Sequence, residues 1–421
     1  MEMGERRAGG ANCCQNGGRS FAQRGGGAVV DGAAVERAMG SVERGEDGAL
    51  SILLLGGTGF LGGAIAGALH RRGHRLTLFD RGGRSLPVGL DVDLENHAQI
   101  ERIQGDRGGD LAALATGRWD VAIDLCGLQP DHLRRTVAVL GDRVDRYVYI
   151  SSIAAYENLN VPGITESDTL RSLPEDGASD LSAVADGGLF GALKAEAERI
   201  LAAAWGDRLL IVRPSLLIGP GDPSDRFSYW VRRLAAGGDV VAPAPPFQPV
   251  QFMDARDLAI WIADAIAQGR SGEFNAACPE RQWTLGSVLA TIQEVCGSAV
   301  QLHWLAEEFL LEAKVEPWIE LPLWLPARDR LRGFARMDCR KIERAGLICR
   351  PLAQTVADLL AWDEQFGAPD RHRAGLPRDR EAALLAQWRR DWLPHHPSPD
   401  PALEPPQSTH SPALEAFDVA L

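Results

Sequence analysis

A glycine-rich turn directly after a short apolar run constrains the fold of this chain more than any other feature. Residues 51–55 are typical of a buried strand, and the sequence Gly56-Gly57-Thr58-Gly59-Phe60-Leu61-Gly62 follows them. Apolar residues then recur at helical spacing up to Gly73, and a second apolar run, residues 75–79, ends at Asp80. Strand, tight turn, helix and strand within about 30 residues predict a βαβ unit, which requires a parallel sheet.

The spacing of the glycines predicts a phosphate-binding turn. Gly56 permits the tight turn, Gly59 lets the backbone approach a pyrophosphate, and Gly62 allows the helix to pack closely on the sheet. The helix N-terminus offers free N–H groups and a positive dipole end to the phosphates. Three more residues complete the candidate cofactor contacts of this turn: Thr58, Phe60 and Leu61. A turn that binds nothing is the alternative, but the strand before it and the helix after it favour a dinucleotide site.

Four residues beyond the turn are candidate contacts for such a cofactor. Asp80 lies where a carboxylate accepts hydrogen bonds from the adenosine ribose of NAD, whereas Arg81 would favour the 2′-phosphate of NADP. Asp80 is favoured over Arg81 because it lies at the end of the strand, and NAD is therefore favoured over NADP. Asp106 is interpreted as an adenine contact or a helix cap. Cys126 ends a later strand, where a small residue would let the cofactor pass, and we expect it to pack rather than to act as a nucleophile.

The alternation of strand and helix patterns continues along the chain. Strands are predicted at residues 120–125, 146–150 and 209–212, and helices at residues 131–140 and 190–204. This order predicts an α/β protein with a doubly wound parallel sheet, the NAD(P)-binding Rossmann fold.

The chain divides into four parts by composition. Residues 1–48 are rich in glycine and are interpreted as a disordered extension, or as an upstream extension that precedes a start at Met39. Residues 49–215 form the predicted NAD(P)-binding domain, and residues 216–366 a smaller mixed substrate or lid domain, partly interleaved with the sheet. Residues 367–421 contain a predicted amphipathic helix at 380–392, expected to dock on the body or on a partner, and then a proline-rich, disordered tail.

Composition excludes several classes of protein. Among 421 residues, 44 Lys and Arg stand against 57 Asp and Glu, and a net charge of −13 disfavours nucleic-acid binding. Seven cysteines without a Cys-x-x-Cys pair make a disulfide framework or a structural zinc site improbable, and we predict no metal site. The longest apolar stretch is interrupted by glycines, so no membrane span is expected, and the chain is predicted to be cytoplasmic.

Seven motifs in order resemble the extended short-chain dehydrogenase/reductase family, the group of NAD-dependent epimerases and dehydratases. The resemblance covers about residues 51–362. Its carriers are the glycine turn, Gly105-Asp106-Arg107, residues 150–156 (ISSIAAY), Lys194, Arg213-Pro214-Ser215, residues 219–222 (GPGD) and residues 252–259 (FMDARDLA).

The resemblance implies roles for particular residues. Ser152 would orient a substrate hydroxyl or carbonyl, and Lys194 would bind the nicotinamide ribose and lower the pKa of a catalytic Tyr four residues earlier. Pro214 and Ser215 would lie at the nicotinamide amide. A homodimer is also implied as an expectation.

This chain departs from the family at the acid–base position, which holds Phe190. A phenyl ring exchanges no proton, and we consider Tyr229 or water as a replacement donor. Dehydratases of the family carry Asp-Glu where this chain has Ile153 and Ala154, so dehydration is disfavoured. The leading hypothesis is an oxidoreductase or epimerase-like enzyme acting on a small hydroxyl- or carbonyl-bearing molecule. The alternatives are a silent dinucleotide-binding sensor or scaffold, and a non-redox isomerase or lyase on the same fold.

Overall fold

The computed structural model describes residues 48–82, 100–174, 187–278, 283–329, 331–367 and 373–396. The predictions of disorder for residues 1–48 and for the proline-rich tail fall, except for Gly48 and the residues up to 396, outside these described residues.

A seven-stranded parallel sheet confirms the predicted doubly wound fold. Its order is β11-β6-β5-β4-β1-β2-β3, and every neighbouring pair runs parallel. The strands are β1 (Ser51–Leu55), β2 (Arg75–Asp80), β3 (Ile100–Gln104), β4 (Trp119–Asp124), β5 (Val144–Ile150), β6 (Leu209–Pro214) and β11 (Gly272–Ala276). The chain builds outward from β1 to β3 and then returns to β4 on the other side of β1. The order therefore reverses beside β1, where such sheets bind ligands.

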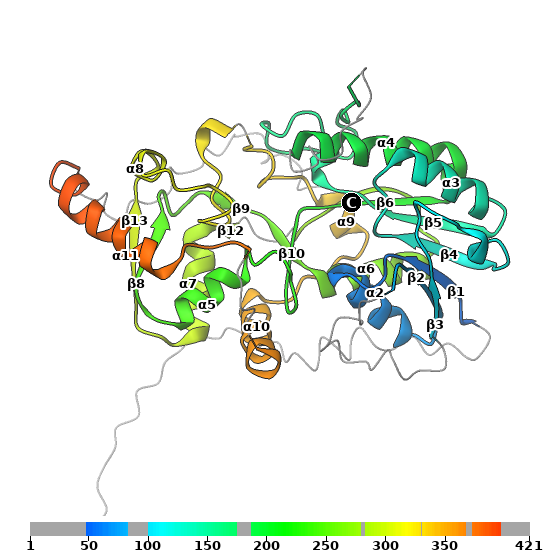
Figure 1. Ribbon diagram of the computed structural model, residues 1–421, viewed down its shortest axis with the longest axis horizontal. Coiled ribbons are helices and arrows are strands. Elements are labelled where there is room, and N and C mark those ends of the chain that lie inside the picture. The colour runs from blue at the N-terminus through cyan, green and yellow to red at the C-terminus, as the bar shows by residue number, and fades with distance from the viewer. Residues whose placement is uncertain are drawn as a thin grey trace, which may run out of the picture. The chain divides into compact units, whose positions relative to one another are not determined.

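Helices cover both faces of this sheet (Figure 1). Helices α2 (Phe60–His70) and α6 (Ala255–Ala267) pack together on one face, and α3 (Pro130–Leu140) and α4 (Gly187–Trp205) on the other. Alternate residues of β1 enter the two cores, because successive side chains of a strand point to opposite faces. Ile52 and Leu54 pack with α2 and α6, whereas Leu53 and Leu55 pack with α3 and α4.

The predicted elements of the sheet are confirmed with small shifts at their ends. The strand predicted at 120–125 is β4, one residue earlier, and the helix predicted at 190–204 is α4, which begins at Gly187. Strand β11 comes from residues well after the predicted dinucleotide domain. It pairs with β6 and forms the edge of the sheet.

A second hydrophobic core lies among the segments that follow β6. Its helices and strands are β7 (Leu216–Ile218), α5 (Ser228–Ala235), β8 (Gly238–Pro243), β9 (Pro249–Val250), β10 (Phe252–Asp254), β12 (Trp283–Thr284), α7 (Leu285–Cys296), β13 (Val300–Leu305), α8 (Glu307–Glu312), α10 (Leu352–Phe366) and α11 (Arg378–Gln387). Helix α11 continues as a π-helix, Trp388–Trp392, and Leu384, Leu385 and Trp388 are buried in this core. This segment overlaps the helix predicted at residues 380–392, and its buried side chains pack in the second core.

Short helices complete the described chain: α9 (Arg340–Arg344), η2 (Ala112–Leu114), η3 (Ile153–Ala155), η5 (Gly206–Arg208) and η6 (Ala327–Asp329). Among the described helices, none combines the length and the apolar character that a membrane crossing requires.

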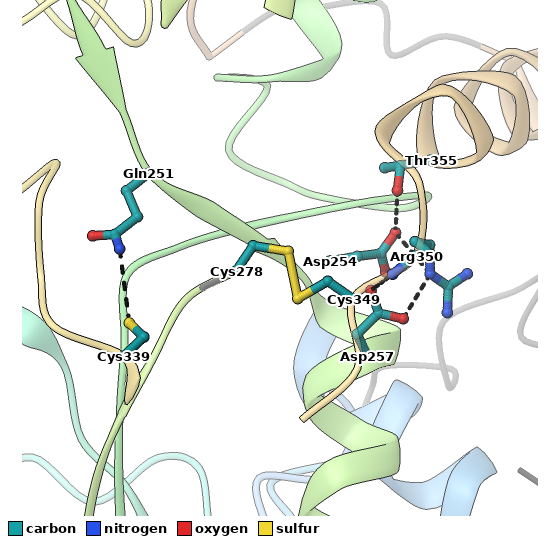
Figure 2. The surroundings of a disulfide bond; sticks show 8 residues. All are labelled: Gln251, Asp254, Asp257, Cys278, Cys339, Cys349, Arg350 and Thr355. Carbon is teal, nitrogen blue, oxygen red and sulfur yellow. Dashed lines mark hydrogen bonds and ion pairs between the residues drawn. A yellow bond between two sulfur atoms is a disulfide. The ribbon is translucent and has the colours of Figure 1, made fainter. Parts of the chain in front are cut away.

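The expectation drawn from the cysteine count needs one correction. Cys278 and Cys349, 71 residues apart, are joined by a disulfide (Figure 2). Cys126, Cys296 and Cys339 are free thiols. Sequence spacing gives no signal for this pair, because it is the packing of the segment after β11 against the segment after α9 that brings the two sulfur atoms together.

Candidate functional site

The glycine-rich turn connects β1 to α2 at the edge of the sheet where its strands end. Gly56 has a φ of 83°, and a Cβ there would lie 2.9 Å from the Cβ of Cys126. A Cβ on Gly62 would lie 2.7 Å from the carbonyl carbon of Gly57. Both positions therefore require glycine, the first for its left-handed backbone and the second for the close approach of helix and turn.

Gly59 is different, because the space beside it is open. A Cβ there would have Gly56 O, 3.8 Å away, as its nearest neighbour. The N-cap of α2 is Gly59, and among the described residues no side chain caps this helix or places an acidic group in its first turn. Thr58 and Phe60 are half-buried at this turn, whereas the side chain of Leu61 is buried in the core. The turn thus presents backbone N–H groups to an open space, and this cradle fits the pyrophosphate of a dinucleotide.

Asp80 ends β2, as predicted, but its carboxylate already has two partners. It accepts the Gly82 N–H at 2.7 Å and lies 3.2 Å from the guanidinium of Arg102. Arg81 is exposed, and its carbonyl accepts a hydrogen bond from Gln104. The cation paired with Asp80 is therefore on the neighbouring strand β3. The sequence analysis missed Arg102, because its role follows only from the register of β2 and β3.

Asp106 and its neighbour Arg107 face different surroundings. Asp106 is exposed and accepts the Gly108 N–H at 2.8 Å. Arg107 is buried, contacts both carboxylate oxygens of Asp124 at 2.6–2.7 Å and donates to Thr136. Burial alone would raise the pKa of Asp124, but the charge and hydrogen bonds of Arg107 hold that pKa below its ordinary value. This buried ion pair fixes the end of β4 beside the turn.

Cys126 lies between this ion pair and the turn. The residue is exposed, and its Sγ is 3.6 Å from Arg107 and would lie 3.1 Å from a Cβ on Gly56. Desolvation of the sulfur, together with the charge of Asp124, raises the pKa of the thiol to about 11. The thiol stays protonated at neutral pH, which argues against a nucleophile.

Lys194 lies at the centre of the site, on α4. Its Nζ donates to Ile150 O at 2.8 Å and to Gly127 O at 3.3 Å, at the ends of β5 and β4. It lies 4.8 Å from the ring centroid of Tyr149, whose hydroxyl donates to Gly127 O at 2.7 Å. The side chain is only 6% exposed, and burial lowers the pKa of Lys194 to about 8.

Phe190 and Ser152 lie on two elements that contact each other. Phe190 is one helical turn before Lys194, with its ring centroid 5.9 Å from Nζ. Ser152 caps η3 by accepting the Ala154 N–H at 3.2 Å, which leaves its hydroxyl proton to donate elsewhere. A Cβ on Gly191 would lie 1.9 Å from Ala154 O, so α4 packs directly against η3.

A buried polar network supports these residues, and the sequence analysis missed it. Glu198, one turn after Lys194, pairs with Arg213 at 2.6 Å and accepts a hydrogen bond from Ser151. Arg213 also donates to the hydroxyl of Tyr156, which donates to Asn275, both at 2.7 Å. The network joins α4 to the ends of β5, β6 and β11. One signal was present, since an arginine inside an apolar strand requires a buried partner.

Pro214 and Ser215 follow Arg213 at the end of β6. Pro214 is buried and lies opposite Ala276 of β11. The Oγ of Ser215 is buried, and within the described part of the chain it has no hydrogen-bond partner. Because a buried hydroxyl without a partner is costly, this atom indicates a ligand group, and it fits the amide that the resemblance places here.

Tyr229 is not brought to this site. It lies in the second core, only 6% exposed, where its ring packs against the backbone of Gly375. Burial and the nearby Glu381 raise the pKa of its hydroxyl above the ordinary value. The interpretation of Tyr229 as a replacement proton donor is therefore corrected, because its hydroxyl faces this core rather than the surroundings of Lys194.

Two curated proteins resemble part of the chain. The chloroplast stem-loop binding protein of 41 kDa b from Arabidopsis thaliana is 28% identical over 228 residues, 52% of this chain and 56% of that protein. A 2′-dehydrokanamycin reductase from Streptomyces kanamyceticus is 26% identical over 236 residues, 54% of this chain and 60% of that protein. The chain thus spans less than two thirds of the length of either relative.

Solved structures share the fold at low sequence identity. WbmG of Bordetella bronchiseptica, in complex with NAD and UDP, superimposes with a TM-score of 0.56 at 16% identity, covering 78% of this chain and 100% of its own. UDP-glucuronic acid 4-epimerase of Bacillus cereus, in complex with NAD, gives 0.54 at 14% identity, covering 76% of this chain and 100% of its own.

A model of the NAD dependent epimerase/dehydratase family matches residues 52–277. The match runs from β1 to the residue after β11. It takes in all seven strands of the sheet, the glycine-rich turn and Lys194, and it covers more than half of the chain. The chain therefore belongs to the NAD dependent epimerase/dehydratase family.

Proposed function

We propose that this protein is an NAD-dependent oxidoreductase or epimerase-like enzyme that acts on a small hydroxyl- or carbonyl-bearing substrate without the usual catalytic tyrosine. One observation carries the proposal: Ser152 and Lys194 lie on packed elements beside an intact dinucleotide cradle, although the acid–base position holds Phe190. A silent binder needs the cradle and the cap that Ser152 makes on η3, but it has no evident use for the hydroxyl proton of Ser152.

Different residues of the chain would bind different parts of NAD. The backbone N–H groups at Gly59 and the start of α2 bind the pyrophosphate, and Asp80 accepts a ribose hydroxyl. Lys194 donates to the second ribose, and the unpaired Ser215 hydroxyl donates to the nicotinamide amide. NAD, when bound, supplies a centre that accepts or returns a hydride. The carboxylate of Asp80 disfavours a 2′-phosphate, so NAD is favoured over NADP.

Ser152 orients the substrate oxygen, and no side chain at position 190 moves its proton. General acid–base catalysis typically contributes about 10²–10⁴-fold, so turnover with an ordinary alcohol or ketone is expected to be low. The favoured substrates are those whose oxygen exchanges its proton with water or is itself acidic. One of the relatives named above is a 2′-dehydrokanamycin reductase, and one of the solved structures is a UDP-glucuronic acid 4-epimerase, which makes carbohydrates the first compounds to test. Ile153 and Ala154 disfavour water elimination.

The second candidate function is a catalytically silent dinucleotide-binding protein, a sensor or scaffold. Phe190 favours it, and so does the similarity to a protein named for stem-loop binding. The net charge of −13 opposes the nucleic-acid version of this reading.

Calorimetric titration with NAD⁺, NADH, NADP⁺ and NADPH tests the shared premise, on protein first checked by absorbance for carried-over cofactor. We expect the NAD pair to bind more tightly than the NADP pair. A screen of keto- and hydroxy-sugars with NADH or NAD⁺ then separates the enzyme from the silent binder. A parallel titration with an RNA hairpin at two salt concentrations tests the second candidate. Absence of dinucleotide binding contradicts both functions.

A further inference from the structure

The disulfide between Cys278 and Cys349 joins the dinucleotide sheet to the segment that leads into α10. Cys278 follows β11, and its N–H donates to Phe252 O of β10 at 3.1 Å. Cys349 lies two residues before Pro351, the N-cap of α10. Figure 2 shows the bond close to a cluster of charged side chains around Arg350. Both cysteines are half-buried, so a small dithiol can reach them.

Arg350, next to Cys349, is held at the start of α6. Its N–H donates to Asp257 at 2.9 Å, and its guanidinium lies 2.8 Å from the same carboxylate and 3.6 Å from Asp254. Thr355 of α10 donates to Asp254 at 2.9 Å. The covalent bond and these polar contacts therefore fix one end of α10 at the same place (Figure 2).

The other end of α10 contacts the segment that follows Ser215. Asp363 pairs with Arg232 of α5 at 2.6 Å. A Cβ on Gly221 would lie 3.2 Å from the ring of Trp362, and a Cβ on Gly219 would lie 3.2 Å from Asp254. The loop at residues 219–222 thus contacts Asp254, which is hydrogen-bonded to the first turns of α10, and Trp362, which lies near the end of that helix.

We propose that the Cys278–Cys349 disulfide is a redox-responsive clamp that orders α10 and, through it, the loop at residues 219–222. A dithiol reductant transfers two electrons and two protons to the bond. Cys278 and Cys349 become free thiols, and the reductant becomes a disulfide. Reduction releases the covalent tie at Cys349, while the cofactor cradle at α2 keeps its own contacts. The clamp therefore acts on α10 and the loop at residues 219–222 rather than on the phosphate-binding turn.

Peptide mapping of protein purified in air is the first test. Free thiols are alkylated in denaturant before digestion, without prior reduction, so that the buried Cys339 also reacts. We expect a cross-linked pair of peptides containing Cys278 and Cys349, whereas Cys126, Cys296 and Cys339 carry the alkyl group. Alkylation of both Cys278 and Cys349 in the untreated protein overturns the proposal.

Thermal melting with and without dithiothreitol is the second test. We expect reduction to lower the melting temperature of the wild type by about 4–8 °C, as loss of a native cross-link does in a domain of this size. C278S and C349S should have melting temperatures close to that of the reduced wild type, and dithiothreitol should not change them. C296S, which removes a free and half-buried thiol, is the matched control and should respond like the wild type. An equal response to reductant in C278S and wild type overturns the clamp.

Hydrogen exchange on the wild type distinguishes a clamp from a general stabiliser. Reduction should speed exchange in α10 and in residues 219–222 and leave α2 unchanged. A uniform change, or none, contradicts the proposal. This readout needs neither a substrate nor bound NAD, so its failure is distinguishable from failure of the proposed function.

Discussion

The ammonium of Lys194 is held by two backbone carbonyls and lies near two aromatic rings, those of Tyr149 and Phe190. Burial lowers the pKa of Lys194 to about 8, and it outweighs the negative charge of Asp124, which favours the ammonium form. Replacement of the tyrosine by Phe190 removes a hydroxyl from this environment without adding a charge. Two residues one helical turn apart therefore separate the two roles: Lys194 is available for cofactor binding, whereas Phe190 cannot transfer a proton.

Binding of NAD⁺ should depend on the charge of Lys194. Below pH 8 the ammonium donates to the ribose, and as the pH rises through about 8 the affinity of the wild type should fall. K194M should bind more weakly at pH 7, and its affinity should stay flat between pH 7 and 9. Calorimetric titration at three pH values measures this. A parallel fall in K194M would assign the pH dependence to another group.

The stability of the folded protein should depend on pH in the opposite direction to its NAD⁺ affinity. At pH 7 the folded wild type keeps a charge that it buries unfavourably, so K194M should melt at a higher temperature. Between pH 8 and 10.5 the folded wild type loses its proton while the unfolded chain keeps it, so wild-type stability rises by up to about 3 kcal/mol. The advantage of K194M should therefore shrink across that window in melting curves. K341M, at an exposed lysine, is the control.

F190Y should create or raise turnover if the site is an impaired reductase. The new hydroxyl would lie one turn before Lys194, and a gain of about 10²–10⁴-fold is the range for acid–base catalysis. Steady-state oxidation of NADH with keto-sugars measures it. F247Y adds the same hydroxyl at an exposed position and should change nothing. If F190Y leaves an active wild type unchanged or impairs it, the chemistry has moved to other groups.

At the scale of elements, two glycines at the start of α2 differ in what lies beside them. Gly59 has open space at its missing side chain, whereas the missing side chain of Gly62 faces backbone. G59V should therefore lower NAD affinity at least about tenfold, by blocking the phosphates, while the fold is retained. Calorimetry and a melting curve measure the two effects. G67A, which meets only a flexible arginine tip, should keep both properties. Unchanged affinity in G59V would argue that the turn binds no phosphate.

The βαβ start and the later alternation were predictable from sequence, because buried parallel strands and amphipathic helices have distinct periods. Ser152, Phe190, Lys194 and Ser215 were found through motifs. Arg102 was not, because only strand register places it beside Asp80. The pairing of Glu198 with Arg213 was missed because the partners lie on α4 and β6, and only the packing of that helix on the sheet brings them together. Tyr229 was misplaced because sequence does not tell which core a buried tyrosine enters.

At the scale of the whole molecule, α11 completes the second core. Leu384, Leu385 and Trp388 are buried there, and the helix also brings a charge into the interior. Glu381 pairs with Arg233 at 2.7 Å and accepts the Val241 N–H at 3.0 Å, so one carboxylate connects α11 to α5 and β8. A segment near the chain's C-terminal end is thus part of the folded body.

Substitution of Glu381 tests how much this docking contributes. E381Q keeps the size of the side chain but leaves the guanidinium of Arg233, which is only 5% exposed, without its counter-charge. Breaking a buried pair in this way typically costs about 3–5 kcal/mol, so the melting temperature should fall by about 5–10 °C. D131N removes an exposed carboxylate paired with Arg134 and should cost less than about 1 kcal/mol. The double variant E381Q/R233M should recover part of the loss, because it buries no unpaired charge. Equal melting of E381Q and D131N would mean that water or another group compensates Arg233, and that α11 is held by its apolar face alone.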